Sequence, residues 1–392
     1  MRASTMSRQR WNSAARPRIG RSQGSSSLSI KVFRMRASFE INSSTGAYSV
    51  ALGEGLVREV VESPAHRIFI VDARLREQVS FVSGPVIEID ATEENKALER
   101  MAPVIEQLKR FGATRETEIV AVGGGIVQDI ATFVASVYMR GLRWHYCPTT
   151  LLGMVDSCIG GKSSINVGTY KNLVGNFHPP ARILIDLGFT DSLDAAQLTS
   201  GLMESVKICY ARGADEFDAY LALQPGVPLA RDKAFSIVER SLKAKKWFIE
   251  TDEFDRAERL LLNFGHTFGH ALESATHFEV PHGIAVGVGM LTAHQFALET
   301  QRLSEHGKAR AATLAAHVKT LLEPVRGTLS SLGRVSAQSL FEHFESDKKH
   351  SQTHYRVIMP VGDGELQRVP LERNEANQAA IVGAFARGIE TF

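Results

Sequence analysis

The stretch EIVAVGGGIVQDIATFVASVYM, residues 118–139, decides the predicted fold of this chain. Its apolar start is typical of a buried strand, which breaks at the three glycines Gly123–Gly125. The apolar residues that follow recur at helical spacing, so a helix is expected next. Backbone N–H groups of such a glycine turn can approach a pyrophosphate at the helix N-terminus. The stretch lacks the GxGxxG fingerprint, however, and an ordinary tight turn would need the same glycines.

Strand and helix patterns alternate on both sides of this stretch. Strands are predicted at residues 48–53, 67–72 and 144–150, and residues 93–112 have helical spacing. Alternation of this kind indicates βαβ units and a parallel sheet. After about residue 190 helical patterns dominate, and only YRVIMP, residues 355–360, resembles a strand.

We therefore predict an α/β fold in two domains. The first is a Rossmann-like nucleotide-binding domain over residues 38–190, and the second is an all-helical domain over residues 191–392. The length of 392 residues, with 44% apolar and 22% charged residues, fits a soluble protein of this size. No apolar run approaches the roughly 20 residues that span a bilayer.

The charge is distributed unevenly. Residues 1–34 hold eight Lys or Arg and no acid, which leaves 37 basic against 43 acidic residues in the remainder. Residues 1–37 are predicted to be a disordered tail, a targeting segment for organelle import, or the product of a start codon placed upstream of Met35. The mildly acidic remainder argues against a nucleic-acid surface, so any anion site must be a local cluster.

The three cysteines form no CxxC pair. Cys147, Cys158 and Cys209 are best interpreted as buried thiols of a protein in a reducing compartment, and we expect the cytoplasm.

Residues 148–180 combine polar groups with an apolar matrix. Lysine ammonium groups and an Asn amide are suitable partners for a phosphate. A solvated loop would also contain lysines and glycines, but flanking segments such as LLGMV would bury some of these groups and demand partners for them. The polar residues of interest are Thr149, Thr150, Asp156, Lys162, Lys171, Asn172 and His178.

Two helical segments carry a candidate metal site. Glu204 and Lys207 lie three apart among apolar neighbours, and His266 and His270 lie four apart on one helix face. His282 follows after a proline turn. A glutamate and two histidines from different helices make a three-ligand set with positions open for substrate. Ordinary packing and a surface salt bridge are the alternative interpretations of these spacings.

Several further basic residues are expected to lie on solvent-exposed faces. Their spacing in the sequence does not show whether they lie close together in the fold. They are Lys243, Lys245, Lys246, Arg259, Lys348 and Lys349.

Taken together, these segments resemble the 3-dehydroquinate synthases, which are sugar-phosphate cyclases. The family patterns occur in order and at matching intervals from about Tyr48 to Lys349, which covers nearly all of residues 38–392. The matching segments are Gly123–Asp129, Tyr138–Gly141, Pro148–Pro180, Gly201–Lys207, Arg259–Glu273, His282–Gly283 and Asp347–Lys349.

The resemblance implies an NAD-binding first domain and a metal-binding second domain. It implies NAD contacts for Asp72, Glu93, Lys96, Gly124, Gly125, Asp129, Thr149, Thr150, Lys171 and Ser192. It implies Zn²⁺ (or Co²⁺) ligation by Glu204, His266 and His282. It implies catalytic roles for Asp156, Lys162, Lys207, Asn263 and His270, and substrate binding by Arg140, Asn172, Lys245, Arg259 and Lys349. Arg140 matches an arginine that reaches the phosphate of a neighbouring subunit, so a homodimer is implied.

The resemblance also implies a reaction. NAD transiently oxidises the C5 hydroxyl of 3-deoxy-D-arabino-heptulosonate 7-phosphate, and phosphate leaves by β-elimination. The hydride then returns, the ring opens, and an intramolecular aldol step closes the carbocycle of 3-dehydroquinate.

This chain departs from the family at Ile284, where a glutamate is usual, and at Ser192, where a threonine is usual. Related cyclases act on an amino analogue of the sugar (amino-dehydroquinate synthase) or on sedoheptulose 7-phosphate (2-epi-5-epi-valiolone synthase). Arg259, Lys245 and Lys349 favour a substrate with a carboxylate, which sedoheptulose lacks. A metal-dependent alcohol dehydrogenase and a non-catalytic relative are weaker alternatives, since the matched site residues are all present.

Overall fold

The stretch at residues 118–139 forms a buried strand and a helix, as predicted. Strand β5 (Glu118–Gly123) ends at the glycines, and α3 (Gly125–Val137) begins directly after them. The computed structural model describes residues 36–62, 65–168, 170–347 and 349–390. Of the tail predicted over residues 1–37, residues 1–35 lie outside this described part, and Ala37 already begins β1 (Ala37–Ile41).

A seven-stranded sheet organises the first half of the chain. Its order is β1-β2-β9-β6-β5-β3-β4, and all neighbours are parallel except β1 and β2. Its central strands are buried along nearly their whole length, as expected for a parallel sheet covered on both faces. The strands are β1 (Ala37–Ile41), β2 (Tyr48–Gly53), β3 (Arg67–Asp72), β4 (Val86–Ile89), β5, β6 (Trp144–Pro148) and β9 (Arg182–Asp186).

The strand order reverses between β3 and β5. The chain passes from β3 outward to β4 and then returns to β5 on the other side of β3. Ligands of open α/β sheets bind outside the carboxyl ends of the strands at such a point. Asp72 ends β3 and Gly123 ends β5, so both predicted NAD segments meet at this edge.

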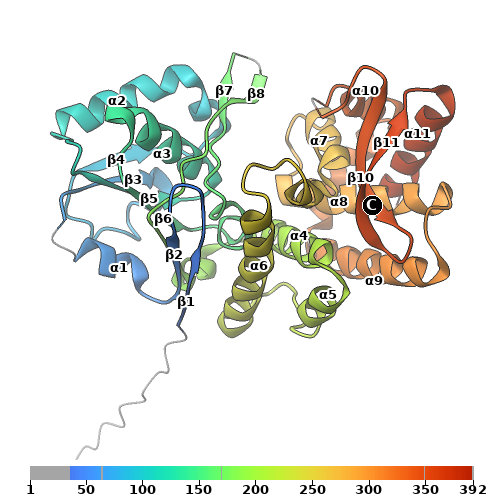
Figure 1. Ribbon diagram of the computed structural model, residues 1–392, viewed down its shortest axis with the longest axis horizontal. Helices are drawn as coiled ribbons and strands as arrows, with labels where there is room; N and C mark the ends of the chain where they lie inside the picture. The colour runs from blue at the N-terminus through green and yellow to red at the C-terminus, as the bar shows by residue number, and fades with distance from the viewer. Residues whose placement is uncertain (1–35, 63–64, 169, 348, 391–392) are drawn as a thin grey trace, which may run out of the picture. The chain divides into compact units, whose positions relative to one another are not determined.

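Helices make up most of the second half (Figure 1). They begin with α4, whose N-terminus has a capping box between Asp194 and Gln197. The helices of the chain are α1 (Leu56–Val61), α2 (Met101–Arg110), α3, α4 (Ala195–Arg212), α5 (Ala214–Leu221), α6 (Arg231–Thr251), α7 (His266–Ala275), α8 (His282–Glu299), α9 (Glu305–Leu322), α10 (Ala337–Glu345) and α11 (Glu375–Ile389).

Two local features differ from the sequence prediction. Helix α2 begins only at Met101, because Ala97 is extended and pairs with Asn166, while residues 93–96 form a separate 3₁₀ turn. The helical half also contains an antiparallel hairpin of β10 (His354–Val361) and β11 (Glu365–Glu372), so it is not entirely helical. The hairpin β7 (Ile165–Val167) and β8 (Tyr170–Val174) lies within the glycine-rich segment.

Candidate functional site

The predicted metal ligands come together from three helices. Nε2 of His266 and Nε2 of His282 lie 3.7 Å and 3.4 Å from Oε1 of Glu204. One ligand atom from each residue lies within 4.8 Å of the others. Glu204 is buried in the middle of α4, His266 begins α7 and His282 begins α8. A carboxylate and two imidazoles at these separations fit a single divalent ion.

The glycine after His282 explains how this ligand reaches α4. A Cβ atom at Gly283 would lie 2.3 Å from the backbone oxygen of Ser200. Only glycine therefore lets the start of α8 approach α4 this closely, one turn before Glu204.

The two histidines of this set lie in different electrostatic environments. Burial, followed by the nearby charge of Lys207, holds the pKa of His266 well below its usual value, so its imidazole is neutral, as a metal ligand must be. Burial opposes protonation of His282, yet Glu204 and Glu273 raise its pKa to about 10. That rise reflects the two carboxylates that face the two ring nitrogens of His282.

Asp156 connects two lysines beside the metal ligands. Its Oδ2 lies 3.2 Å from Nζ of Lys207, its other carboxylate oxygen forms an ion pair with Lys245, and its backbone oxygen accepts a 2.6 Å hydrogen bond from Lys245. Lys207 is also paired with Glu204. Burial alone would raise the pKa of Asp156, but the two ammonium groups hold it well below its usual range. Asp156 therefore remains ionised and fixes both lysines.

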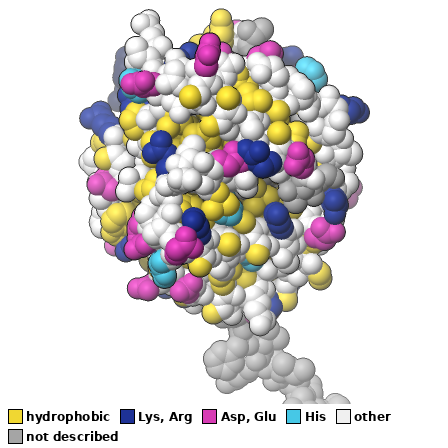
Figure 2. Space-filling model, turned by 90° about the vertical axis from the view of Figure 1, so that its right-hand side faces the viewer, with side chains coloured by type: hydrophobic (Ala, Val, Ile, Leu, Met, Phe, Trp, Pro, Cys, Tyr) yellow, Lys and Arg dark blue, Asp and Glu magenta, His cyan; other side chains and the backbone are white. Residues whose placement is uncertain are grey.

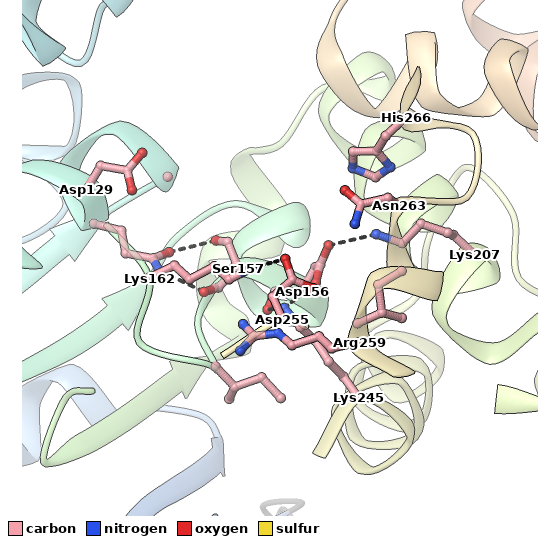
Figure 3. A pocket seen from close by; sticks show the side chains of 14 residues that line it. Asp129, Asp156, Ser157, Lys162, Lys207, Lys245, Asp255, Arg259, Asn263 and His266 are labelled. Carbon is pink, nitrogen blue, oxygen red and sulfur yellow. Dashed lines mark hydrogen bonds and ion pairs between the residues drawn. The ribbon is translucent and has the colours of Figure 1, made fainter. Parts of the chain in front are cut away.

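These groups line one cavity with further cations (Figure 3). Nζ of Lys162 lies 2.6 Å from Oδ2 of Asp255, and burial together with the charge of Arg259 lowers the pKa of Lys162. Arg259 is buried in the same wall. The lining residues are Gly125, Gln128, Asp129, Asp156, Ser157, Ile159, Lys162, Lys207, Lys245, Asp255, Arg259, Leu262, Asn263 and His266.

A second polar network lies at the predicted NAD side. Nζ of the buried Lys96 is 2.9 Å from Asp129 and donates a 3.1 Å hydrogen bond to Oδ1 of Asn172. Burial raises the pKa of Asp129 to about 6, although Lys96 opposes the shift. Glu93 lies 3.9 Å from both Lys96 and Lys171. Five residues predicted from the family resemblance thus belong to one network.

Five of the remaining predicted NAD residues lie at or just after the ends of strands. Asp72 accepts hydrogen bonds from the backbone and guanidinium of Arg74. Gly124 and Gly125 begin α3, and Thr149 and Thr150 follow β6, where Thr149 donates its backbone N–H to the carbonyl of Gly123.

Four further predicted residues, not yet placed above, also lie outside the lining of the cavity. Ser192 ends the 3₁₀ segment Leu187–Ser192, and Arg140 is exposed after α3 in a left-handed conformation (φ 69°). His270 faces Asp347 across 3.7 Å, beside the metal ligands. The backbone N–H of Lys349 donates a hydrogen bond to Asp347. The positive charge of Lys349 adds to the effect of burial in lowering the pKa of His266.

Sequence reasoning missed two acidic residues of this region. Asp255 lies in the charged run TDEFDRAER, which is typical of a solvated loop, yet it binds Lys162 in the cavity wall. Glu273 ends the matched segment Arg259–Glu273, and its carboxylate faces Nδ1 of His282 at 3.2 Å. Its position three residues after His270 was the available signal.

The surface and thiols agree with the composition. Acidic and basic side chains are interspersed over the described part of the face in Figure 2. The three cysteines are buried and form no disulfide. Among the described residues, no helix is both long and apolar enough to cross a bilayer.

Comparisons with known proteins agree with the geometry. Residues 86–200 match the model of the 3-dehydroquinate synthase N-terminal region, and residues 201–350 match that of the C-terminal region. The 3-dehydroquinate synthase of Pyrobaculum neutrophilum is 36% identical over 85% of this chain and 94% of its own length. That of Xylella fastidiosa is 33% identical over 83% of this chain and 87% of its own.

Solved structures show the same fold. A 2-deoxy-scyllo-inosose synthase complexed with carbaglucose-6-phosphate, NAD⁺ and Co²⁺ has a TM-score of 0.76 at 24% identity, covering 90% of this chain and 99% of its own. The 2-epi-5-epi-valiolone synthase of Streptomyces hygroscopicus, with NAD⁺ and Zn²⁺ bound, has a TM-score of 0.71 at 26% identity, covering 88% and 97%. On the sequence relatives and the two family matches, this chain belongs to the 3-dehydroquinate synthase family.

Proposed function

We propose that this chain is a 3-dehydroquinate synthase, a carbon–oxygen lyase that converts 3-deoxy-D-arabino-heptulosonate 7-phosphate to 3-dehydroquinate and phosphate. The proposal is carried by one cavity, in which three cationic side chains lie beside the proposed metal ligand His266; they are Lys162, Lys245 and Arg259. Lys207, which pairs with Glu204, lines the same cavity. Three cations in one wall suit a substrate that carries both a carboxylate and a phosphate.

Both cofactors have suitable positions. Glu204, His266 and His282 would hold Zn²⁺ or Co²⁺, as their donor atoms and separations fit one ion. The glycine turn after β5, Asp72 at the end of β3, and the network around Lys96 would hold NAD at the point where the strand order reverses. When bound, NAD supplies reversible hydride acceptance and the metal polarises substrate oxygens.

The chain's own residues would bind the substrate and handle protons. Lys162, Lys245 and Arg259 bind its anionic groups, while Asp156 keeps Lys245 and Lys207 in place. Asn263 lines the same wall and offers an amide to a hydroxyl. Burial lowers the pKa of His270, so its imidazole is neutral near pH 7; with Nδ1 facing Asp347, its other nitrogen is available to accept a proton.

Other parts of the proposal concern assembly and location. Arg140 is exposed and does not line the cavity of its own chain. This position suits an arginine that contributes to the site of a second copy in a homodimer. The three cysteines form no disulfide, which is typical of proteins in a reducing compartment such as the cytoplasm. We place the boundary between the NAD-binding and metal-binding domains near residue 190, between the last sheet strand and α4.

The decisive experiment is a product assay with purified protein, NAD and Zn²⁺. The heptulosonate phosphate should yield inorganic phosphate and a cyclic product without net NADH, because the hydride is returned. Turnover of sedoheptulose 7-phosphate instead would make the chain a 2-epi-5-epi-valiolone synthase-like cyclase, and turnover of the amino sugar would make it an amino-dehydroquinate synthase. Net NADH with a simple alcohol would indicate a dehydrogenase.

A further inference from the structure

Helix α7 places three potential ligands on one face. His266, His270 and Glu273 are at positions i, i+4 and i+7, which align along an α-helix. Of these, Glu273 has no role in the function proposed above. Its side chain is 13% exposed, so its carboxylate is largely removed from solvent.

Helix α8 starts opposite Glu273 with His282. The two ring nitrogens of His282 face two different carboxylates. Nε2 of His282 lies 3.4 Å from Oε1 of Glu204. Nδ1 of the same ring lies 3.2 Å from both carboxylate oxygens of Glu273. The imidazole is therefore held between the predicted metal set on one edge and Glu273 on the other.

Close packing fixes this relationship between the two helices. A Cβ atom at Gly289 of α8 would lie 2.1 Å from the backbone oxygen of Gly265, which caps α7. The backbones of the two helices thus pack closely, which fixes the positions from which the side chains of Glu273 and His282 extend.

The chemistry of imidazole assigns a role to Glu273. A neutral histidine that offers the Nε2 lone pair to a metal carries its proton on Nδ1, and that N–H needs an acceptor. Carboxylates that accept this proton orient the ring and increase its basicity. We propose that Glu273 is a positioning residue of the metal centre, which fixes the tautomer and orientation of His282. The inference rests on the proposed function only in assuming that Glu204, His266 and His282 bind a metal.

A competing possibility makes a distinct prediction. Ligand atoms of His270, Glu273 and His282 also lie within 4.8 Å of one another, so Glu273 could instead bind a second ion. In that case Nδ1 of His282 would offer a lone pair rather than a proton. The two possibilities therefore differ in the number of ions bound.

The test measures zinc stoichiometry and affinity by chelator competition in the full-length protein. Wild type should bind one equivalent. Glu273→Ala should also bind one, about 10- to 100-fold more weakly, and Glu273→Gln should fall between them because its amide oxygen can still accept from Nδ1. The matched control is Glu279→Gln, an exposed acid of the following loop that pairs with Arg334; it should match wild type.

A second measurement separates positioning from general destabilisation. Visible absorption of the Co²⁺-substituted protein should shift in Glu273→Ala and remain unchanged in Glu279→Gln. Equal zinc affinity and spectra for wild type and Glu273→Ala would overturn the inference. Two equivalents in wild type and one in Glu273→Ala would also overturn it, in favour of a second ion. If wild type binds no zinc, the metal centre of the proposed function fails, and this inference fails with it.

Discussion

Nζ of Lys207 lies 3.2 Å from Oδ2 of Asp156, although both side chains are largely removed from solvent. The pair joins the middle of α4 to the short π-helical turn Gly153–Ser157. Because Lys245 shares the same carboxylate, Asp156 forms ion pairs with two buried cations at once.

Asp156→Asn should therefore destabilise the protein. Removing one partner of a buried ion pair leaves uncompensated charge, and a loss of about 3 kcal/mol in the free energy of unfolding is expected. Urea denaturation measures it. Asp191→Asn is the control, since Asp191 pairs with Arg231 on the surface and should cost less than about 1 kcal/mol. Equal unfolding midpoints for the two variants would contradict the role of Asp156.

Two lysines of α6 should differ sharply in their effect on substrate binding. Lys245 is buried in the cavity wall, whereas Lys243 is exposed and pairs with Glu239. Lys245→Met should raise the KM for the sugar phosphate roughly 10- to 100-fold, the loss of one charge-assisted hydrogen bond. Lys243→Met should leave KM unchanged, and the Kd for NAD should be the same in both. Steady-state kinetics and an NAD titration test this, and indistinguishable KM values would refute it.

Metal binding should stabilise the fold. At free zinc of about 100 times Kd, binding adds about 2.7 kcal/mol, which corresponds to roughly 5 °C in thermal midpoint. Treatment with a chelator should remove this increment, and added zinc should restore it. His266→Ala should show no zinc-dependent shift, whereas His306→Ala, an exposed histidine of α9, should retain it. A shift preserved in His266→Ala would place the ion elsewhere.

Acid stability should depend on two histidines far from the cavity. Burial lowers the pKa of His294 and of His317 to about 4, and in the described residues no hydrogen-bond partner meets Nε2 of either. Because an unfolded histidine titrates near 6.5, the unfolded state binds more protons between pH 6.5 and 4.

The free energy of unfolding should thus fall as pH drops through that window, by at most roughly 3 kcal/mol for each histidine. Urea titrations at pH 7, 6 and 5 would measure the slope. The double variant His294→Gln, His317→Gln should have a flatter profile over the same range. An unchanged slope would show that these histidines are not the source.

Local pattern was sufficient where short-range physics dominates. The apolar run of β5, the glycines after it and the helical periodicity of α3 specify their own conformations, and the spacing of His266 and His270 follows from helix geometry alone. Strand β11 was not predicted, because five of its eight residues are exposed and Pro370 interrupts it. It becomes a strand by pairing with β10.

The sequence by itself determined the fold class, the family and the residue types of the candidate site. Only the tertiary structure decided which charges meet. It distinguished Lys245 from Lys243, placed Asp255 against Lys162, and set Glu273 beside His282. The physical reason is that helix periodicity fixes which face a side chain occupies, whereas partners across elements depend on how closely their backbones pack. The interpretation of the glycines at residues 123–125 as part of a nucleotide site likewise depended on the sheet order. They lie where the ends of β3 and β5 are neighbours, which is where open α/β sheets bind ligands.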